Sequence, residues 1–280
     1  MARVLGVLLA GLSLLLVFGL LFPAIYSGRA TTDRLRCTDH LRSIGAFGTL
    51  HTSQPATGLP AAKTEFPAGT VPASASEVED RLSLYAGILS GLRLTEKERQ
   101  QTRAAPFLSE LSSLDLSKPW NDPVHDKLAR TRISVLICPG NVPPANPAAP
   151  ASTMYLGNGG IGADAPTKAI VDNPKSAGVF RYDTPTLAGE VTDGLSHTIQ
   201  IGEVSEFGNP WMRGGPSTVL AVDADGGPWL GGGRNYGGNH RGGAMFSFAD
   251  GSARFLTTGI APGIFKAMLT IAGNETDLVE

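Results

Sequence analysis

The sequence has little cysteine and little charge. Only two of its 280 residues are cysteines, and neither belongs to a C-x-x-C pair. The pattern of a redox-active cysteine pair or of a cysteine-based zinc site is therefore missing. Charged residues make up 17% of the chain, the formal net charge is -2, and no long run of Lys or Arg occurs. Because nucleic-acid binding needs a basic surface, we expect no nucleic-acid partner.

Long helices are disfavoured, because the chain contains 35 Gly and 20 Pro. The 42% of hydrophobic residues still suffices for a buried core, and the simplest organisation is one compact domain with appended segments. Glycine is concentrated between residues 226 and 243, where nine of eighteen residues are Gly. Such a loop either approaches another backbone closely or stays mobile.

One long apolar run stands at the beginning of the sequence. No charged residue occurs from Val4 to Gly28, and 19 of these residues precede Pro23. This length is close to the ~20 residues that a helix needs to cross a bilayer. A cleaved signal peptide is the alternative, but its apolar region usually has ~7–15 residues and ends at an A-x-A-like site. We therefore predict a retained membrane anchor over residues 1–28 and an exported domain over residues 29–280.

The anchor also predicts a location and an orientation. We expect a single-pass protein of the cytoplasmic (inner) membrane, in contact with the membrane through its N-terminal helix. A short N-terminal tail and a large following body favour a cytoplasmic N-terminus, with the C-terminal domain facing the periplasm or the exterior.

Two helical stripes follow the anchor. Cys37, Leu41, Ile44 and Gly48 are spaced by four, three and four residues, which predicts that the anchor continues as a long helix. A second stripe predicts a helix over residues 78–92, with its apolar face in the core.

The second half of the chain favours β-structure. Short β-branched runs predict strands at 132–139 and 196–204, whereas "NGGIGAD" (158–164) is typical of a turn. Residues 244–256 predict a hairpin whose two-residue turn is Asp250-Gly251. The fold class is therefore α+β, with an antiparallel β-sheet.

Cys37 and Cys138 are expected to form a disulfide, since two thiols of an exported domain commonly pair. Two unpaired buried thiols are the alternative.

His240 lies ten residues before Asp250, and this pair admits two interpretations. A metal site would use His240, Asp250 and Asn239, but one His and one Asp do not complete a coordination shell. The structural interpretation places Asp250 in a turn and lets His240 fasten the glycine loop by a hydrogen bond. We prefer the structural interpretation and predict no metal.

Two further patterns suggest other functions. Ser196 beside His197 is a weak indication of a hydrolase, because neighbours on a strand point to opposite faces. The three tryptophans are more typical of core residues than of a sugar-binding surface; they are Trp120, Trp211 and Trp229.

With these residues together, the chain resembles the planctomycete proteins that carry the domain of unknown function 1559, whose closing signature is H-X9-DG. His240 and Asp250-Gly251 fit that signature, and residues 191–206 resemble an internal block that contains Asp193, Gly194 and Glu203. Shorter blocks also match: "CTDHLRSIG" (37–45), "FPAG" (66–69), "DLSKPWNDP" (115–123) and "LICPG" (136–140).

The resemblance implies a pilin-like leader, a long N-terminal helix and a β-rich head in the manner of pseudopilins. It implies no enzymatic reaction and no cofactor. The N-terminus departs from the usual leader, because it has no Gly-Phe cleavage site and no Glu at the fifth mature position. The resemblance therefore does not predict processing by a prepilin peptidase or assembly into a filament.

We expect a non-enzymatic, membrane-anchored, pseudopilin-like envelope protein that acts through contacts with envelope protein partners. The alternative is an extracellular solute- or carbohydrate-binding module. A hydrolase is a third possibility, which would need Ser196 or His240 beside an acid or base in a cleft.

Overall fold

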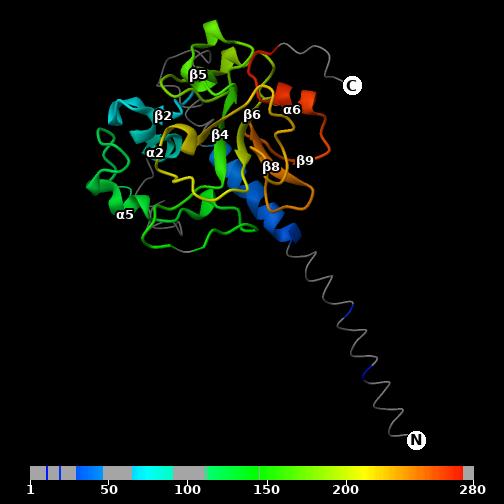
Figure 1. The fold of residues 1–280 in the computed structure, drawn as a ribbon, viewed down its shortest axis with the longest axis horizontal. Coiled ribbons are helices and arrows are strands. Elements are labelled where there is room, and N and C mark those ends of the chain that lie inside the picture. Colours follow the sequence, from blue (N-terminus) through cyan, green and yellow to red (C-terminus); the bar gives the residue numbers. More distant parts are fainter. Residues whose placement is uncertain are drawn as a thin grey trace, which may run out of the picture.

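The protein has an α+β fold in a computed structural model that describes residues 30–46, 65–90, 113–144 and 146–273, together with Gly11, Gly19 and Leu111. Figure 1 shows a central sheet with helices around it. The α-helices of the described chain are a segment over 30–46, α2 (Leu84–Ser90), α5 (Asp126–Ala129) and α6 (Pro262–Met268).

The main sheet has five strands in the order β7-β4-β6-β8-β9. Their bounds are β4 (Tyr155–Ile161), β6 (Ile199–Glu203), β7 (Val219–Val222), β8 (Gly243–Phe248) and β9 (Ala253–Thr257). The sheet that the sequence predicts to be antiparallel is mixed, because β4 and β7 run parallel whereas the other three pairings are antiparallel. β7 follows β6 in the chain but pairs with β4, so the connection over 204–218 crosses the end of β4.

Short elements surround the main sheet. Two small antiparallel pairs are β1 (Glu65–Phe66) with β5 (Thr186–Leu187), and β2 (Thr70–Val71) with β3 (Leu82–Ser83). The 3-10 helices are η2 (Pro72–Ser74), η3 (Val78–Asp80), η4 (Pro123–His125), η5 (Ser134–Leu136), η6 (Ala165–Thr167), η7 (Ile170–Asp172), η8 (Ala188–Glu190) and η9 (Gly215–Ser217).

The two faces of the sheet are covered by different helices. Along β8, Met245 contributes to the apolar cluster that contains the 30–46 helix, whereas Phe246 contributes to the cluster that contains α6. This alternation follows from the two-residue period of a strand. On the α6 side, the rings of Phe246 and Phe265 pack edge to face at 5.6 Å.

The 30–46 helix packs closely against β6 and β8, which confirms the predicted stripe as far as Ile44. Cys37, Leu41 and Ile44 are all buried. A Cβ atom on Gly45 would lie 2.2 Å from Ser247 Oγ, so the glycine permits the close approach of helix and sheet. Gly48 and the predicted anchor over residues 1–28 lie outside the described residues, apart from Gly11 and Gly19. Of the helices that the structure describes, none combines the length and apolarity needed to cross a membrane.

Two other predicted elements differ from the structure. The helix expected over 78–92 is interrupted, because η3 and β3 precede α2, which begins at Leu84. Pairing of β3 with β2 overrides the helical period there. The strand expected over 132–139 is the 3-10 helix η5 with irregular flanks. Its apolar residues are buried by side-chain packing without strand pairing, since Ile133, Leu136 and Ile137 all belong to the core.

The β8–β9 hairpin is confirmed, but its turn differs from the prediction. Gly251 N donates to Phe248 O at 2.8 Å, so Ala249 and Asp250 are the central turn residues. Gly251 follows them with φ of 81°. The turn therefore has the longer form in which a left-handed residue follows the central pair, rather than the predicted two-residue form.

We expect Gly251→Ala to lower the free energy of unfolding of the protein by more than ~1 kcal/mol, because alanine is strained at positive φ. Gly263→Ala is the matched control. It lies in α6 and has no atom within 4 Å of an added Cβ, so the free energy should stay unchanged or rise. Denaturant titration of the purified variants measures both effects, and equal effects would contradict the assignment of strain to Gly251.

A buried candidate site beside the disulfide

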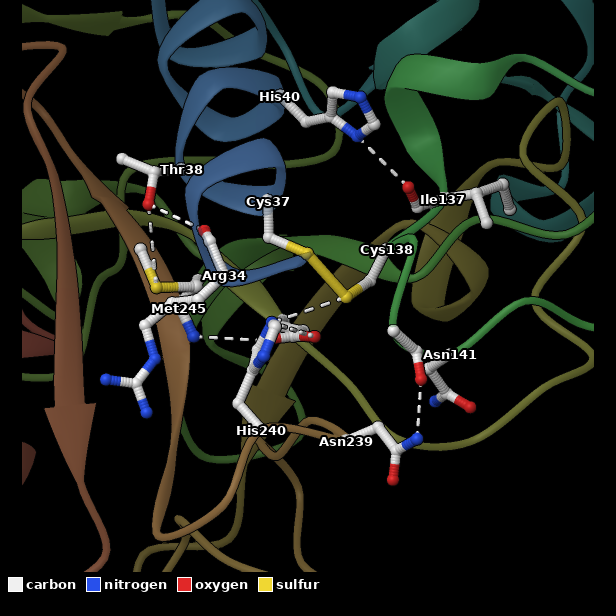
Figure 2. The surroundings of a disulfide bond; sticks show 12 residues. Arg34, Cys37, Thr38, His40, Ile137, Cys138, Asn141, Asn239, His240 and Met245 are labelled. Carbon is white, nitrogen blue, oxygen red and sulfur yellow. Dashed lines mark hydrogen bonds and ion pairs between the residues drawn. A yellow bond between two sulfur atoms is a disulfide. The ribbon is translucent and has the colours of Figure 1, made fainter. Parts of the chain in front are cut away.

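The predicted disulfide between Cys37 and Cys138 is confirmed. Cys37 lies on the buried stripe of the 30–46 helix, and Cys138 follows η5, with a Cα–Cα distance of 5.5 Å. Both cysteines are fully buried. Close to the bridge, His40 Nδ1 is 3.0 Å from Ile137 O, so a polar contact supports the covalent one (Figure 2).

Glu203 is a fully buried carboxylate at the end of β6. Its Oε2 accepts a hydrogen bond of 3.0 Å from Met245 N on β8. Its Oε1 has no hydrogen-bond partner among the residues that the structure describes. The glycine loop packs directly on this carboxylate, because a Cβ on Gly238 would lie 2.4 Å from Oε2. Glycine at 238 is therefore required by close packing.

His240 joins the disulfide and the carboxylate. Its Nε2 lies 3.4 Å from Cys138 Sγ and 3.6 Å from Glu203 Oε1. Figure 2 shows the ring of His240 directed at the disulfide. The sequence predicts that a ring nitrogen of His240 binds the hairpin or a neighbouring backbone group, whereas in the structure Nε2 contacts these two side chains. His240 still restrains the glycine loop, since Glu203 is in turn held by β8.

Burial determines the charge of this pair. Desolvation raises the pKa of Glu203 to about 7, although the hydrogen bond from Met245 N acts in the opposite direction. Desolvation also lowers the pKa of His240, and the nearby charge of Arg34 acts in the same direction. Both groups therefore favour their neutral forms near pH 6.5.

Asp250 does not belong to this site. Its Oδ1 accepts from Ser252 N at 2.9 Å, and its N–H donates to Leu195 O at 3.0 Å. His240 precedes β8 and Asp250 follows it. The nine-residue spacing thus reflects the length of one strand and its turn.

Asp193 and Gly194 form a second turn beside the hairpin. Asp193 Oδ2 accepts a hydrogen bond of 2.7 Å from Gly273 N, which fastens the segment after α6. Gly194 has φ of 97°, and its carbonyl accepts from His197 N at 3.0 Å. Both residues have structural contacts.

The other sequence candidates are not brought to the site. Ser196 Oγ and His197 Nδ1 are 3.3 Å apart and exposed. Trp211 and Trp229 are buried and Trp120 is partly buried, as predicted for core residues.

Two surface cavities lie near the glycine loop. One of about 390 Å³ opens beside His240 and includes Asp33, Arg34 and Arg241 in its lining. The other, of about 360 Å³, is lined by residues that include Glu206, Asn209, Arg234 and Asn235. Its lining is mainly polar, and it lies on the β4–β7 side of the loop.

The protein is thus an α+β head whose N-terminal helix is bound by a disulfide, with a buried Glu203–His240 pair beside that disulfide. These features define a structural class, but they do not identify an activity. Residues 29–221 match the family described as "Protein of unknown function (DUF1559)", and the chain belongs to that family. The matched region includes Glu203 and ends before His240, so it does not test the H-X9-DG signature. The chain matches neither a curated protein nor a solved structure.

Sequence reasoning named Glu203 and His240 but did not pair them. The sequence pattern that could have indicated Glu203 is a single acidic residue directly after the strand segment "IQIG". The structure also brings four possible metal ligands together, whose ligand atoms all lie within 4.8 Å of one another: Cys37, Cys138, Glu203 and His240.

Glu203 predicts a pH effect on stability. Its folded pKa of about 7 exceeds the ordinary value of 4.5 for a glutamate, so the folded state binds more protons between these two pH values. Its contribution to stability is present below about pH 4.5 and is lost as the pH rises through 7. We expect the stability difference between the wild type and Glu203→Gln to fall by on the order of 2–3 kcal/mol from pH 5 to 7.5.

Each variant is compared with the wild type at both pH values, which separates the titration of Glu203 from the titration of the histidines. Glu77→Gln is the control, because Glu77 is exposed and its side chain makes no cap hydrogen bond. The difference in the free energy of unfolding between Glu77→Gln and the wild type should not change with pH. A pH-independent difference for Glu203→Gln in denaturant titrations would show that Glu203 is not the titrating group.

Proposed function

We propose that the protein is a membrane-anchored, pseudopilin-like envelope protein that acts through protein-protein contacts and not by catalysis. In this proposal residues 1–28 hold it in the cytoplasmic membrane as a single span. The head over residues 29–280 faces the periplasm or the exterior and meets its partners there.

The rigid junction between the 30–46 helix and the head carries this proposal. The helix is bonded covalently to the segment after η5, and its inner stripe belongs to the same core cluster as Ile201 of β6 and Met245 of β8. Arg34 also lies over the ring of Phe255 on β9, 3.9 Å from its centroid. A helix fixed at so many points would hold the head in one orientation relative to the membrane.

The outer face of the same helix is free of the sheet. Leu35 is 61% exposed, and its exposed neighbours on that face are polar. A single exposed leucine within a polar surface suits a specific, moderate contact with another protein.

A non-enzymatic role is supported by the arrangement of the hydrolase candidates. Among the residues that the structure describes, no carboxylate forms a hydrogen bond with His197 to orient its ring beside Ser196. His240 faces a disulfide and a buried acid, and its side-chain contacts with the described residues include no serine.

The polar cavity of about 360 Å³ favours a second candidate function, the extracellular solute- or carbohydrate-binding module. Its acid, amides and guanidinium are suitable hydrogen-bonding groups for a sugar. The buried Trp211 and Trp229, however, provide no stacking platform.

We expect the full chain to sediment with membranes, to resist extraction by alkaline carbonate and to be released by detergent. A variant that lacks residues 1–28 should be found in the soluble fraction, because the apolar segment is then absent. Immunoblots of the fractions measure both. A full chain that carbonate releases would contradict the anchor.

The helix face is tested by a photo-crosslinking amino acid at position 35 in intact cells. We expect a discrete adduct with an envelope protein from this position. Position 171 is the control, because Val171 is 85% exposed and lies on η7, away from the helix. Equal adducts from both positions, or none from 35, would contradict a contact through this face.

A further inference from the structure

We propose that Cys37, Cys138, Glu203 and His240 form a zinc site when the disulfide is reduced. This inference goes beyond the proposed function, because it assigns a metal to the junction between helix and head. It also revises the expectation of no metal, which considered a different set of ligands.

The distances suit tetrahedral coordination. Zinc bonds of about 2.0–2.3 Å place neighbouring ligand atoms about 3.3–3.8 Å apart. His240 Nε2 lies 3.4 Å from Cys138 Sγ and 3.6 Å from Glu203 Oε1. Two edges of the tetrahedron are therefore formed already, and separation of the two sulfurs after reduction would open its centre.

The chemical types of the four ligand atoms favour zinc over calcium and magnesium. Two thiolates, one imidazole and one carboxylate oxygen form a mixed set that zinc accepts. Calcium and magnesium prefer shells of oxygen atoms, which this site does not offer.

An independent observation points to a ligand at this position. Glu203 is fully buried, and within the described part of the chain its Oε1 has no hydrogen-bond partner. Buried polar atoms without partners are uncommon and costly. The same oxygen faces His240 Nε2, so a cation between them would supply the missing interaction. Met245 N holds the other oxygen, as expected of an outer contact that orients a metal ligand.

The site also has a route to solvent. The cavity of about 390 Å³ beside His240 reaches the surface between the start of the 30–46 helix and the glycine loop. Gly140 lines this cavity and lies next to two of the ligands, because a Cβ at this position would be in van der Waals contact with His240 Cε1 at 3.7 Å and with Cys138 Sγ at 3.8 Å.

The chemistry balances with a dithiol as reductant. The dithiol gives two electrons and two protons, the Cys37–Cys138 S–S bond breaks, two thiols form, and the dithiol becomes a disulfide. Zinc then displaces the two thiol protons to solvent, together with the carboxyl proton of Glu203 where that group is protonated, so Glu203 binds as a carboxylate and His240 as a neutral ring. Either the disulfide or the zinc ion would hold the helix on the head.

The test uses the purified full chain in detergent, reduced by a phosphine without oxygen and titrated with zinc against a chromophoric chelator. We expect one zinc ion per reduced chain and no such binding by the oxidised chain. Cobalt substituted for zinc should give the visible bands of tetrahedral thiolate coordination. Zinc should also raise the melting temperature of the reduced chain, or refold it if reduction alone unfolds it.

Variants assign the ligands. His240→Ala and Glu203→Gln should each weaken zinc binding by about tenfold or more, and a double Cys37→Ser, Cys138→Ser variant should abolish it. His197→Ala and Asp250→Asn are controls that should bind as the wild type does, because both residues lie outside the cluster. The proposal is overturned if the reduced wild type binds no stoichiometric zinc, if zinc neither stabilises nor refolds it, or if His240→Ala and Glu203→Gln bind unchanged.

Discussion

The contact between the 30–46 helix and the main sheet is the constraint on which the rest of the structure depends. One face of the sheet is apolar and is covered by this helix, whereas the other face is covered by α6. Without the helix, Ile201 and Met245 would lose their cover, and burial of apolar area is the main source of stability. The disulfide at Cys37 adds a covalent link to this coverage, since it joins the helix to a segment 101 residues away.

Glu203 organises the polar interior at the same junction. The acid lies where β6 ends and β8 begins, so one carboxylate contacts the sheet through Met245 and the glycine loop through His240. The loop reaches the carboxylate only because Gly238 has no side chain. A buried acid of this kind limits which groups can surround it, because each hydrogen-bond partner that the carboxylate lacks costs free energy of folding.

Predictions from the sequence succeeded where local periodicity and packing agreed. The stripe through Cys37 and the strands of the β8–β9 hairpin follow their periods, and the structure confirms them. The strand β4 was missed, because its residues 157–160 read Gly-Asn-Gly-Gly and resemble a turn. These residues form a strand through close approach, since a Cβ on Gly157 would lie 2.7 Å from Phe180. The helix over 78–92 failed for a similar reason, because long-range pairing replaced a local preference.

The sequence by itself determined which cysteines pair, which face of the 30–46 helix is buried and that Gly251 takes a positive φ. The pairing follows from the number of cysteines, the buried face from the helical period, and the glycine from a local backbone angle. Only the tertiary structure decided that His240 meets Glu203 and not Asp250. The antiparallel pairing of β6 with β8 brings the end of one strand beside the start of the other. Strand order and register arise from the packing of the whole sheet, so no local pattern specifies which chain-distant residues become neighbours.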